Sequence, residues 1–361
     1  MHLCSAQLEC GNMTQFEIAG RRIGAGHSPY LIAEMSGNHN GDINRAIKLI
    51  DAAKASGAHA VKLQSYTADT ITIDSDRPEF QLNDGLWAGR TLYELYQEAH
   101  TPWEWHDQLF KHAADIGITI FSSPFDPSAV DMLENLKAPA FKIASFEIVD
   151  IPLIKYVARL GKPMILSTGM ASLGDIAEAV SAVRETPETP LMLLHCTSGY
   201  PTPAEDCDLR TISHLAEAFG VLVGLSDHTE GVAVPVASIA MGAVLVEKHF
   251  TLSRSDGGVD AEFSLEPEEF KSMARACDTA WRAIGHVDYN IKASEASALQ
   301  SRRSLYAVGN IAKGDVFTAK NVRSIRPGLG LLPKYLPDVL GRTATRDIQF
   351  GEPISWQMVA E

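Results

Sequence analysis

The sequence has few basic residues and no long apolar run. Its 361 residues include 31 Lys and Arg against 45 Asp and Glu, which gives a formal net charge of -14. Nucleic-acid binding needs clustered cations that release counterions, so this balance predicts no nucleic-acid partner. No apolar stretch approaches the roughly 20 residues that span a bilayer, and the N-terminus lacks a basic segment followed by an apolar one. We therefore predict no membrane association.

Cysteines are also scarce, and they follow no metal-ligand or disulfide spacing. The five are Cys4, Cys10, Cys196, Cys207 and Cys277. This usage is typical of a reducing compartment, so we predict a cytoplasmic protein. The hydrophobic fraction of 45% and the charged fraction of 21% are those of a globular chain. Residues 1–14 show little periodic pattern and are predicted to form a flexible tail.

From about residue 16 to residue 285, short apolar runs alternate with amphipathic helical patterns. This alternation is the signature of βα units around a parallel sheet, and eight units close a (β/α)8 TIM barrel. We predict this α/β fold for residues 15–285. The predicted strands are 30–35, 60–64, 118–122, 140–144, 163–167, 191–196, 221–226 and 244–248. The helical stretches between them include 43–56, 104–116, 176–184, 212–219 and 232–241.

The pattern changes after residue 285. Residues 286–302 are polar and rich in Ala and Ser, as in a linker, and residues 303–361 contain short strand patterns with Pro and Gly turns. A segment of fewer than about 70 residues has a small hydrophobic core and usually needs contacts with a larger domain or another subunit for stability. We predict a small accessory domain over residues 303–361.

Nearly every predicted barrel strand ends in polar or charged side chains. The C-terminal ends of barrel strands form the active-site mouth, so converging polar endings predict an enzyme with its site there. The endings are Glu34, Lys62 with Gln64, Ser122 with Ser123, Lys142 with Ser145, Ser167 with Thr168, Thr197 with Ser198, Asp227 with His228, and Glu247 to His249.

His228 and His249 follow the last two predicted strands and should lie close together. Two imidazoles with carboxylates nearby suit Mn2+, Co2+ or Zn2+, with positions left for water and a substrate oxygen. Such an ion would make an aldehyde more electrophilic. The alternative is a pair of hydrogen-bonded polar residues at strand ends.

Lys62 and Lys142 end two other strands, with several hydroxyl side chains in the same mouth. Ammonium groups and hydroxyls favour a pocket for phosphate and carboxylate. A Schiff-base lysine is the competing interpretation. The Gly-rich loop 36–42 has two interpretations as well, an anion site at a helix start or a turn with an N-cap at Asp42.

Seven ordered motifs resemble the sialic acid synthase family. They are IAEMSGNHNG at 32–41, VKLQ at 61–64, FKIAS at 141–145, STGM at 167–170, HCT at 195–197, GLSDHT at 224–229 and EKHFT at 247–251. The resemblance runs from about residue 16 to the end. Residues 303–361 resemble the SAF (antifreeze-like) domain of these synthases. Residues 86–106 and the SGYP sequence at 198–201 are similar to the pseudaminic acid synthase branch.

The resemblance implies a transferase that condenses phosphoenolpyruvate with an amino-sugar aldehyde. It also implies a domain-swapped homodimer and a divalent metal, Mn2+ first, with Co2+ or Mg2+ as the other candidates. The branch implies 2,4-diacetamido-2,4,6-trideoxy-altrose as the sugar and pseudaminate as the product, with N-acetylneuraminate or legionaminate synthesis as alternatives. Two other classes remain as alternatives. One is a Schiff-base aldolase, and the other is a non-catalytic protein whose SAF-like segment binds ice or a partner.

The family's site residues carry over onto matching positions. His228 and His249 would bind the metal. Glu34, Lys62, Gln64, Glu147 and Asp260 would be catalytic, with either Glu34 or Glu147 orienting the attacking water. Phosphoenolpyruvate would contact Lys62, Ser123, Lys142, Ser145, Ser167, Ser198 and Tyr200. The sugar would contact Gln64, Asp260 and the partner subunit's Arg326. N-acetylneuraminate synthases usually carry Asn where this chain has Ser198, so this position departs from their pattern.

Overall fold

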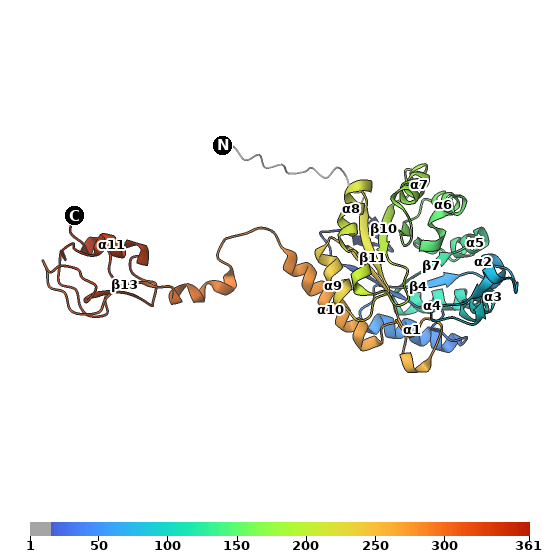
Figure 1. Cartoon of the computed structure of the whole chain (residues 1–361), viewed down its shortest axis with the longest axis horizontal. Helices are drawn as coiled ribbons and strands as arrows, with labels where there is room; N and C mark the ends of the chain where they lie inside the picture. Colours follow the sequence, from blue (N-terminus) through green and yellow to red (C-terminus); the bar gives the residue numbers. More distant parts are fainter. Residues whose placement is uncertain (1–15) are drawn as a thin grey trace. The chain divides into compact units, whose positions relative to one another are not determined.

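The computed structural model describes residues 16–361, which form two compact units (Figure 1). The first unit ends at Gly285 and the second spans His286–Glu361. The predicted tail at residues 1–14 lies outside the described residues. Within the described part of the chain, no helix combines the length and apolar character that crossing a bilayer requires.

The first unit is a closed barrel of eight parallel strands surrounded by helices (Figure 1). The predicted TIM barrel is therefore confirmed, and each predicted strand end lies within two residues of the observed one. The strands are β3 (Tyr30–Glu34), β4 (Ala60–Ser65), β7 (Thr119–Pro124), β8 (Phe141–Ile143), β9 (Met164–Ser167), β10 (Leu191–Cys196), β11 (Leu222–Asp227) and β12 (Leu245–His249).

Eight helices of 8 to 18 residues cover the barrel. They are α1 (Ile43–Ala55), α4 (His106–Ile116), α5 (Pro127–Asn135), α6 (Ile151–Ala158), α7 (Leu173–Arg184), α8 (Arg210–Phe219), α9 (Ala233–Ala240) and α10 (Pro267–Ile284). The five predicted helical stretches are confirmed, whereas α5, α6 and α10 were not predicted. The missed α5 and α6 do carry start signals, because Asp126 and Asp150 cap them and a proline follows in the first turn.

The barrel interior is apolar at the N-terminal ends of the strands. Ile32, Ala60, Phe121 and Ile165 pack there in one cluster. A hairpin of β1 (Phe16–Ile18) and β2 (Arg21–Ile23) adds three apolar side chains to the same cluster. Because side chains alternate along a strand, every second residue faces the interior, and the next inward positions lie nearer the C-terminal ends of the strands. Those positions carry the polar residues.

A long insertion between β4 and β7 lies at the C-terminal side of the barrel. It contains α2 (Ala68–Ile71), the two-stranded β5 (Gln81–Leu82) and β6 (Arg90–Thr91), and α3 (Leu92–Ala99). The indole of Trp87 donates a 2.7 Å hydrogen bond to the Val259 carbonyl, so the insertion is tied to the segment that follows β12.

The second unit is built around short strands and turns. Strands β13 (Ser304–Ala307) and β14 (Val322–Ile325) pair antiparallel, and isolated bridges connect other segments. One short helix, α11 (Leu336–Val339), packs on them. The core consists of Leu305, Ala307, Ile311, Phe317, Val322, Val339, Ala344, Ile348, Ile354 and Val359.

Candidate active site

The barrel mouth holds two lysines and two glutamates. Glu34, Lys62, Lys142 and Glu247 project from β3, β4, β8 and β12, and each is at most 5% exposed. Lys62 Nζ lies 2.8 Å from Glu34 Oε2 and 3.7 Å from Glu247 Oε1, and Lys142 Nζ lies 3.0 Å from the same Glu247 oxygen. Lys62 also donates to Ser123 Oγ at 3.2 Å. The network places two buried ammonium groups, each paired with a carboxylate, in the mouth of an otherwise anionic protein.

Burial and mutual attraction shift the pKa values of these groups in opposite directions. Burial lowers the pKa of Lys62, but the carboxylates of Glu247 and Glu34 outweigh it, so the pKa is raised. The pKa of Lys142 stays lowered, because burial and the charge of Lys62 outweigh its contact with Glu247. Burial raises the pKa of Glu34, whereas the two lysines overcome burial and lower the pKa of Glu247. Glu247 is therefore the fixed anion of the group.

Three hydroxyls converge beside the lysines in a place that a larger residue would fill. Gly169 N–H donates to Ser145 Oγ at 3.1 Å, and a Cβ atom on Gly169 would lie 2.8 Å from that oxygen and still closer to Ser198 Oγ. Ser167 Oγ is buried and has no hydrogen-bond partner among the described residues. Three hydroxyls around a glycine, next to two ammonium groups, form a cradle suited to phosphate or carboxylate oxygens.

The two predicted metal ligands face one another. The rings of His228 and His249 have centroids 5.4 Å apart, and Phe263 packs against both. His228 Nδ1 lies 3.0 Å from the Thr197 carbonyl oxygen, which can only accept, so this nitrogen carries the proton and Nε2 is left for a ligand. His249 Nδ1 is buried 3.8 Å from an Asp260 oxygen, and within the described part of the chain it has no hydrogen-bond partner.

These imidazoles fit a divalent ion that keeps open positions. Burial is the main cause that holds the pKa of His249 well below its usual value, so this ring is neutral and can coordinate. Burial lowers the pKa of His228, but Cys196 and the Thr197 carbonyl outweigh burial and raise it, so a metal ion at Nε2 would have to displace a proton. Across residues 16–361, no three His, Cys, Asp or Glu side chains gather closely enough to enclose an ion. Two protein nitrogens would leave the remaining positions to water and substrate.

A cavity of about 310 Å³ opens beside the imidazoles. Its polar side includes Ser36, Gln64, Glu147 and Asp260. Gln64 donates to Glu34 at 2.9 Å and to Ser36 at 3.1 Å, and Ser36 in turn donates to Asp260. Burial is the main cause that raises the pKa of Glu147 to about 7 and that of Asp260 to about 6. The rest of the lining is largely apolar or aromatic and includes Tyr66, Ile71, Leu95, Phe125 and Phe146, which we call the apolar wall.

Most of the predicted site residues come together in this mouth. Tyr200 lies between the cavity and the histidines, with its ring 4.5 Å from that of His228. Arg326 belongs to the second unit, where it is exposed, and its contact with a partner stays a prediction. The N-cap interpretation of loop 36–42 is confirmed, since the Asp42 side chain accepts from the Asn44 N–H at 2.8 Å.

Two residues with no predicted role take part in the site. Glu247 joins both lysines, and Ser36 connects Gln64 to Asp260. The strand-end pattern identified Glu247, but not that it faces Lys62 and Lys142 across the barrel. The contact of Ser36 with Asp260 joins segments 224 residues apart and has no local sequence signal.

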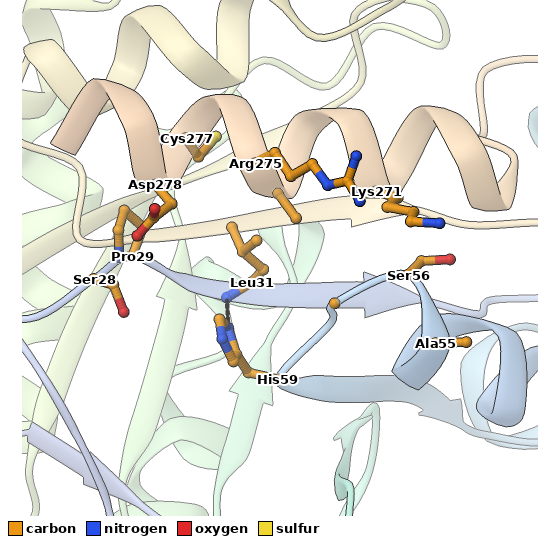
Figure 2. A pocket seen from close by; sticks show the side chains of 12 residues that line it. Ser28, Pro29, Leu31, Ala55, Ser56, His59, Lys271, Arg275, Cys277 and Asp278 are labelled. Atoms are coloured by element: carbon orange, nitrogen blue, oxygen red, sulfur yellow. Dashed lines mark hydrogen bonds between the residues drawn. The ribbon is translucent and has the colours of Figure 1, made fainter. Parts of the chain in front are cut away.

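Another hollow, of about 420 Å³, lies away from the strand ends that carry the chemistry (Figure 2). It is lined where β3 and β4 begin, by Leu31 and His59, and by Lys271 and Arg275 of α10 (Figure 2). His59 Nδ1 accepts from the Leu31 N–H at 2.9 Å, so its polar group is already used. The N-terminal face of a TIM barrel usually serves stability, and we assign this hollow no role.

Comparisons with known proteins agree with this geometry. The NeuB family matches residues 49–289 and the SAF domain matches residues 302–360. A pseudaminic acid synthase from Campylobacter jejuni is 43% identical over 90% of this chain and 95% of its own length. An N,N'-diacetyllegionaminic acid synthase from the same species is 37% identical over 90% of this chain and 98% of its own.

Solved structures give the same result. The crystal structure of an N-acetylneuraminic acid synthetase from Leptospira borgpetersenii, in complex with citrate, has a TM-score of 0.71 and 30% sequence identity. The match covers 80% of this chain and 95% of that one. Because the family match spans most of the barrel and the relatives align over nearly their whole length, this chain belongs to the NeuB family and carries a C-terminal SAF domain.

Proposed function

We propose that this chain condenses phosphoenolpyruvate with 2,4-diacetamido-2,4,6-trideoxy-altrose to give pseudaminate and phosphate. One observation carries the proposal. A buried lysine pair, suited to an anionic three-carbon substrate, lies in the same barrel mouth as a pair of imidazoles suited to an aldehyde-activating metal. The 43% identity to a pseudaminic acid synthase favours this product over N-acetylneuraminate or legionaminate.

The lysines and hydroxyls would hold phosphoenolpyruvate. Lys62 and Lys142 neutralise its carboxylate and phosphate charges, while Ser145, Ser167 and Ser198 donate to its oxygens. Ser123 positions the Lys62 ammonium, and Tyr200 covers the site from the side of the histidines. With its charge neutralised, the enol can direct C3 at the aldehyde carbon of the sugar.

The histidines and the polar wall would hold the aldehyde end of the sugar. His228 and His249 would bind a divalent ion, Mn2+ first, which when bound polarises the aldehyde carbonyl. Gln64 and Asp260 face the sugar hydroxyls from the polar wall. Water adds at C2 after the carbon–carbon bond has formed, and the phosphate leaves with the bridging oxygen. Glu34 or Glu147 orients that water.

The apolar wall of the cavity suits a deoxygenated sugar. Ile71, Leu95 and Phe125 present only rings and methyl groups, which offer a sugar hydroxyl no hydrogen-bond partner. A 6-deoxy sugar places a methyl group on such a surface, and its acetamido groups add two more. This favours a trideoxy sugar over N-acetylmannosamine, although it does not choose between the altro and manno epimers.

A homodimer in which the SAF domain of one chain covers the barrel mouth of its partner is part of this proposal. Large apolar side chains that are exposed on both units support this arrangement. In the barrel unit, Phe146, Val149 and Met170 follow β8 and β9 at the mouth and are 59 to 64% exposed. In the second unit, Leu329 and Phe350 are both 71% exposed. The partner subunit's Arg326 would then contact the sugar.

We also propose that the enzyme acts in the cytoplasm. Cys196, Cys207 and Cys277 are buried free thiols. Such thiols persist in a reducing compartment.

The position of bond cleavage in phosphoenolpyruvate tests the reaction class. With 18O in the oxygen that bridges C2 and phosphorus, we expect released phosphate to retain the label, as measured by mass spectrometry. Phosphate without the label would contradict the mechanism, because P–O cleavage leaves the bridging oxygen on C2 of the sugar acid, where it can exchange with water. Borohydride added during turnover should trap no substrate on Lys142, and a stable adduct there would support the aldolase instead.

The pH dependence of the rate tests which carboxylate orients the water. If Glu147 acts as a carboxylate, kcat/KM should rise up to pH about 7, the pKa that burial gives this group. Glu147→Gln should then lose that ascending limb and about 10²-fold to 10⁴-fold in rate. Retention of the rate within a few-fold would assign the role to Glu34. Glu188→Gln, a change on the barrel surface, is the matched control.

A further inference from the structure

The residues next to the two histidines form an ion pair on the other side of the sheet. Side chains alternate along strands β11 and β12, so Ser226, Glu247 and His249 face the barrel interior. The residues between them, Asp227 and Lys248, face outward into the layer beneath the helices. The register pairs these two residues directly, and their side chains are 2% and 0% exposed.

This pair also holds the chain on both sides of His228. Lys248 Nζ donates to the Asp227 carboxylate and to the Thr229 carbonyl oxygen. The Asp227 carboxylate accepts from the Thr229 N–H at 3.2 Å and from Thr229 Oγ1 at 3.0 Å. The residues before and after His228 are thus bonded to the residue that precedes His249. Two strand ends that carry the imidazoles become one hydrogen-bonded unit.

Packing alone does not explain a buried ion pair in this layer. The other outward residues of the same strands, Val223, Leu225 and Val246, belong to the apolar core. Replacing a buried ion pair by apolar residues of similar volume is often neutral or stabilising, so stability gives little reason for charges here. Asp227 and Lys248 do not line the cavity that would receive the sugar. Their hydrogen bonds instead reach the backbone around His228.

We infer that Asp227 and Lys248 are positioning residues that fix the spacing of the His228 and His249 imidazoles. This inference rests on the proposed metal-binding role of the two histidines. Metal ligands must be held within about 0.5 Å of their working geometry, and groups that orient them change metal affinity by about 10-fold to 100-fold when lost. Without the pair, the turn at 227–229 would keep the β-ladder, the Thr202 N–H bond to the His228 carbonyl at 3.0 Å and the His228 ring contact with Thr197, but it would lose its link to the strand end that carries His249.

The test separates positioning from stability with a charge-free replacement. The double variant Asp227→Leu with Lys248→Met keeps the volume of the pair and removes its charges and hydrogen bonds. We expect its Kd for Mn2+, measured by calorimetry on the full-length protein, to rise by at least about 10-fold. Leu133→Ala, a core change in the last turn of α5, is the destabilised control and should bind Mn2+ as the parent does. An unchanged Kd in the double variant overturns the inference.

A readout without metal keeps the inference testable if the parent protein binds no Mn2+. In nitrogen NMR of the histidine rings, the parent should show one tautomer at His228, with the proton on Nδ1 facing Thr197. The double variant should show two exchanging tautomers, and a spectrum identical to the parent overturns the inference. If the double variant does not fold, Asp227→Asn combined with Lys248→Met decides both readouts, because it keeps the size of Asp227 and leaves neither position with a buried unpaired charge.

Discussion

Lys62→Met should reduce kcat/KM for phosphoenolpyruvate by about 10³-fold or more, because a single preorganised donor is already worth about 10²-fold to 10³-fold. Methionine keeps the unbranched shape of lysine and removes only its charge and its donors. The loss should appear in binding as well as turnover, because Lys142 alone would then face Glu247, Glu34 and the incoming anion. Calorimetry with phosphoenolpyruvate and the rate of phosphate release measure the two effects.

The same change should destabilise the protein by roughly 3 to 5 kcal/mol, the cost of leaving one side of a buried ion pair unpaired. Protonation of Glu34, whose pKa burial already raises, would offset part of this loss. Lys162→Met is the matched control, since Lys162 pairs with Glu134 at 2.5 Å in a partly solvated position. It should change stability by less than about 1 kcal/mol and leave the kinetics intact. A Lys62→Met variant within about 10-fold of the parent kcat/KM would contradict the phosphate-pocket assignment.

Removal of the metal should abolish phosphate release, and Mn2+ should restore it. The reason is that, among residues 16–361, no lysine or arginine lines the cavity that would receive the sugar, so no side-chain cation there could polarise the aldehyde in place of the metal. The variants His228→Gln and His249→Gln should each lose at least about 10³-fold in turnover and should not recover with added Mn2+. Chelation with EDTA followed by titration of Mn2+, Co2+ and Mg2+ measures the effect and ranks the ions.

The control for these variants is His112→Gln, because His112 pairs with Asp51 on the surface and lies outside the mouth. It should respond to chelation and to Mn2+ as the parent does. Full turnover in excess chelator, with no metal bound to the protein, would remove the metal from the mechanism. The buried histidines would then be a hydrogen-bonded pair at two strand ends.

The fold was predictable because the inward-facing residues of each barrel strand recur at every second position of the sequence, first apolar and then polar. Lys62, two residues after Ala60, and Lys142, two after Ala140, mark where each strand leaves the apolar cluster. The helix α6 was missed because its inward face carries Leu153, Ile154 and Val157 and its pattern reads as another apolar run. Its Asp-x-Pro start was the signal that could have identified it.

The chemistry of the site was predictable only as far as it depends on single strand ends. The sequence shows that β4, β8 and β12 each carry a charged residue near their ends, but it does not show which of these charges meet. The contact of Glu247 with both lysines follows from the closure of the barrel. The apolar wall that bears on sugar choice combines Tyr66 and Leu95 of the insertion with Phe125 after β7. That wall has no periodic pattern, because loops and short helices build it. The roles of the site residues are tested by the variants above.

A comparison of three sugars tests the central proposal most directly. Phosphate release from phosphoenolpyruvate with Mn2+ is measured with the 2,4-diacetamido-2,4,6-trideoxy sugars of the altro and manno series and with N-acetylmannosamine. We predict that the altro sugar gives a kcat/KM at least about 100-fold above either of the others, because a site that discriminates on hydrogen-bonded groups reaches such ratios. Preference for the manno sugar or for N-acetylmannosamine would contradict pseudaminate synthesis. Phosphate release with none of the three sugars would contradict the synthase itself.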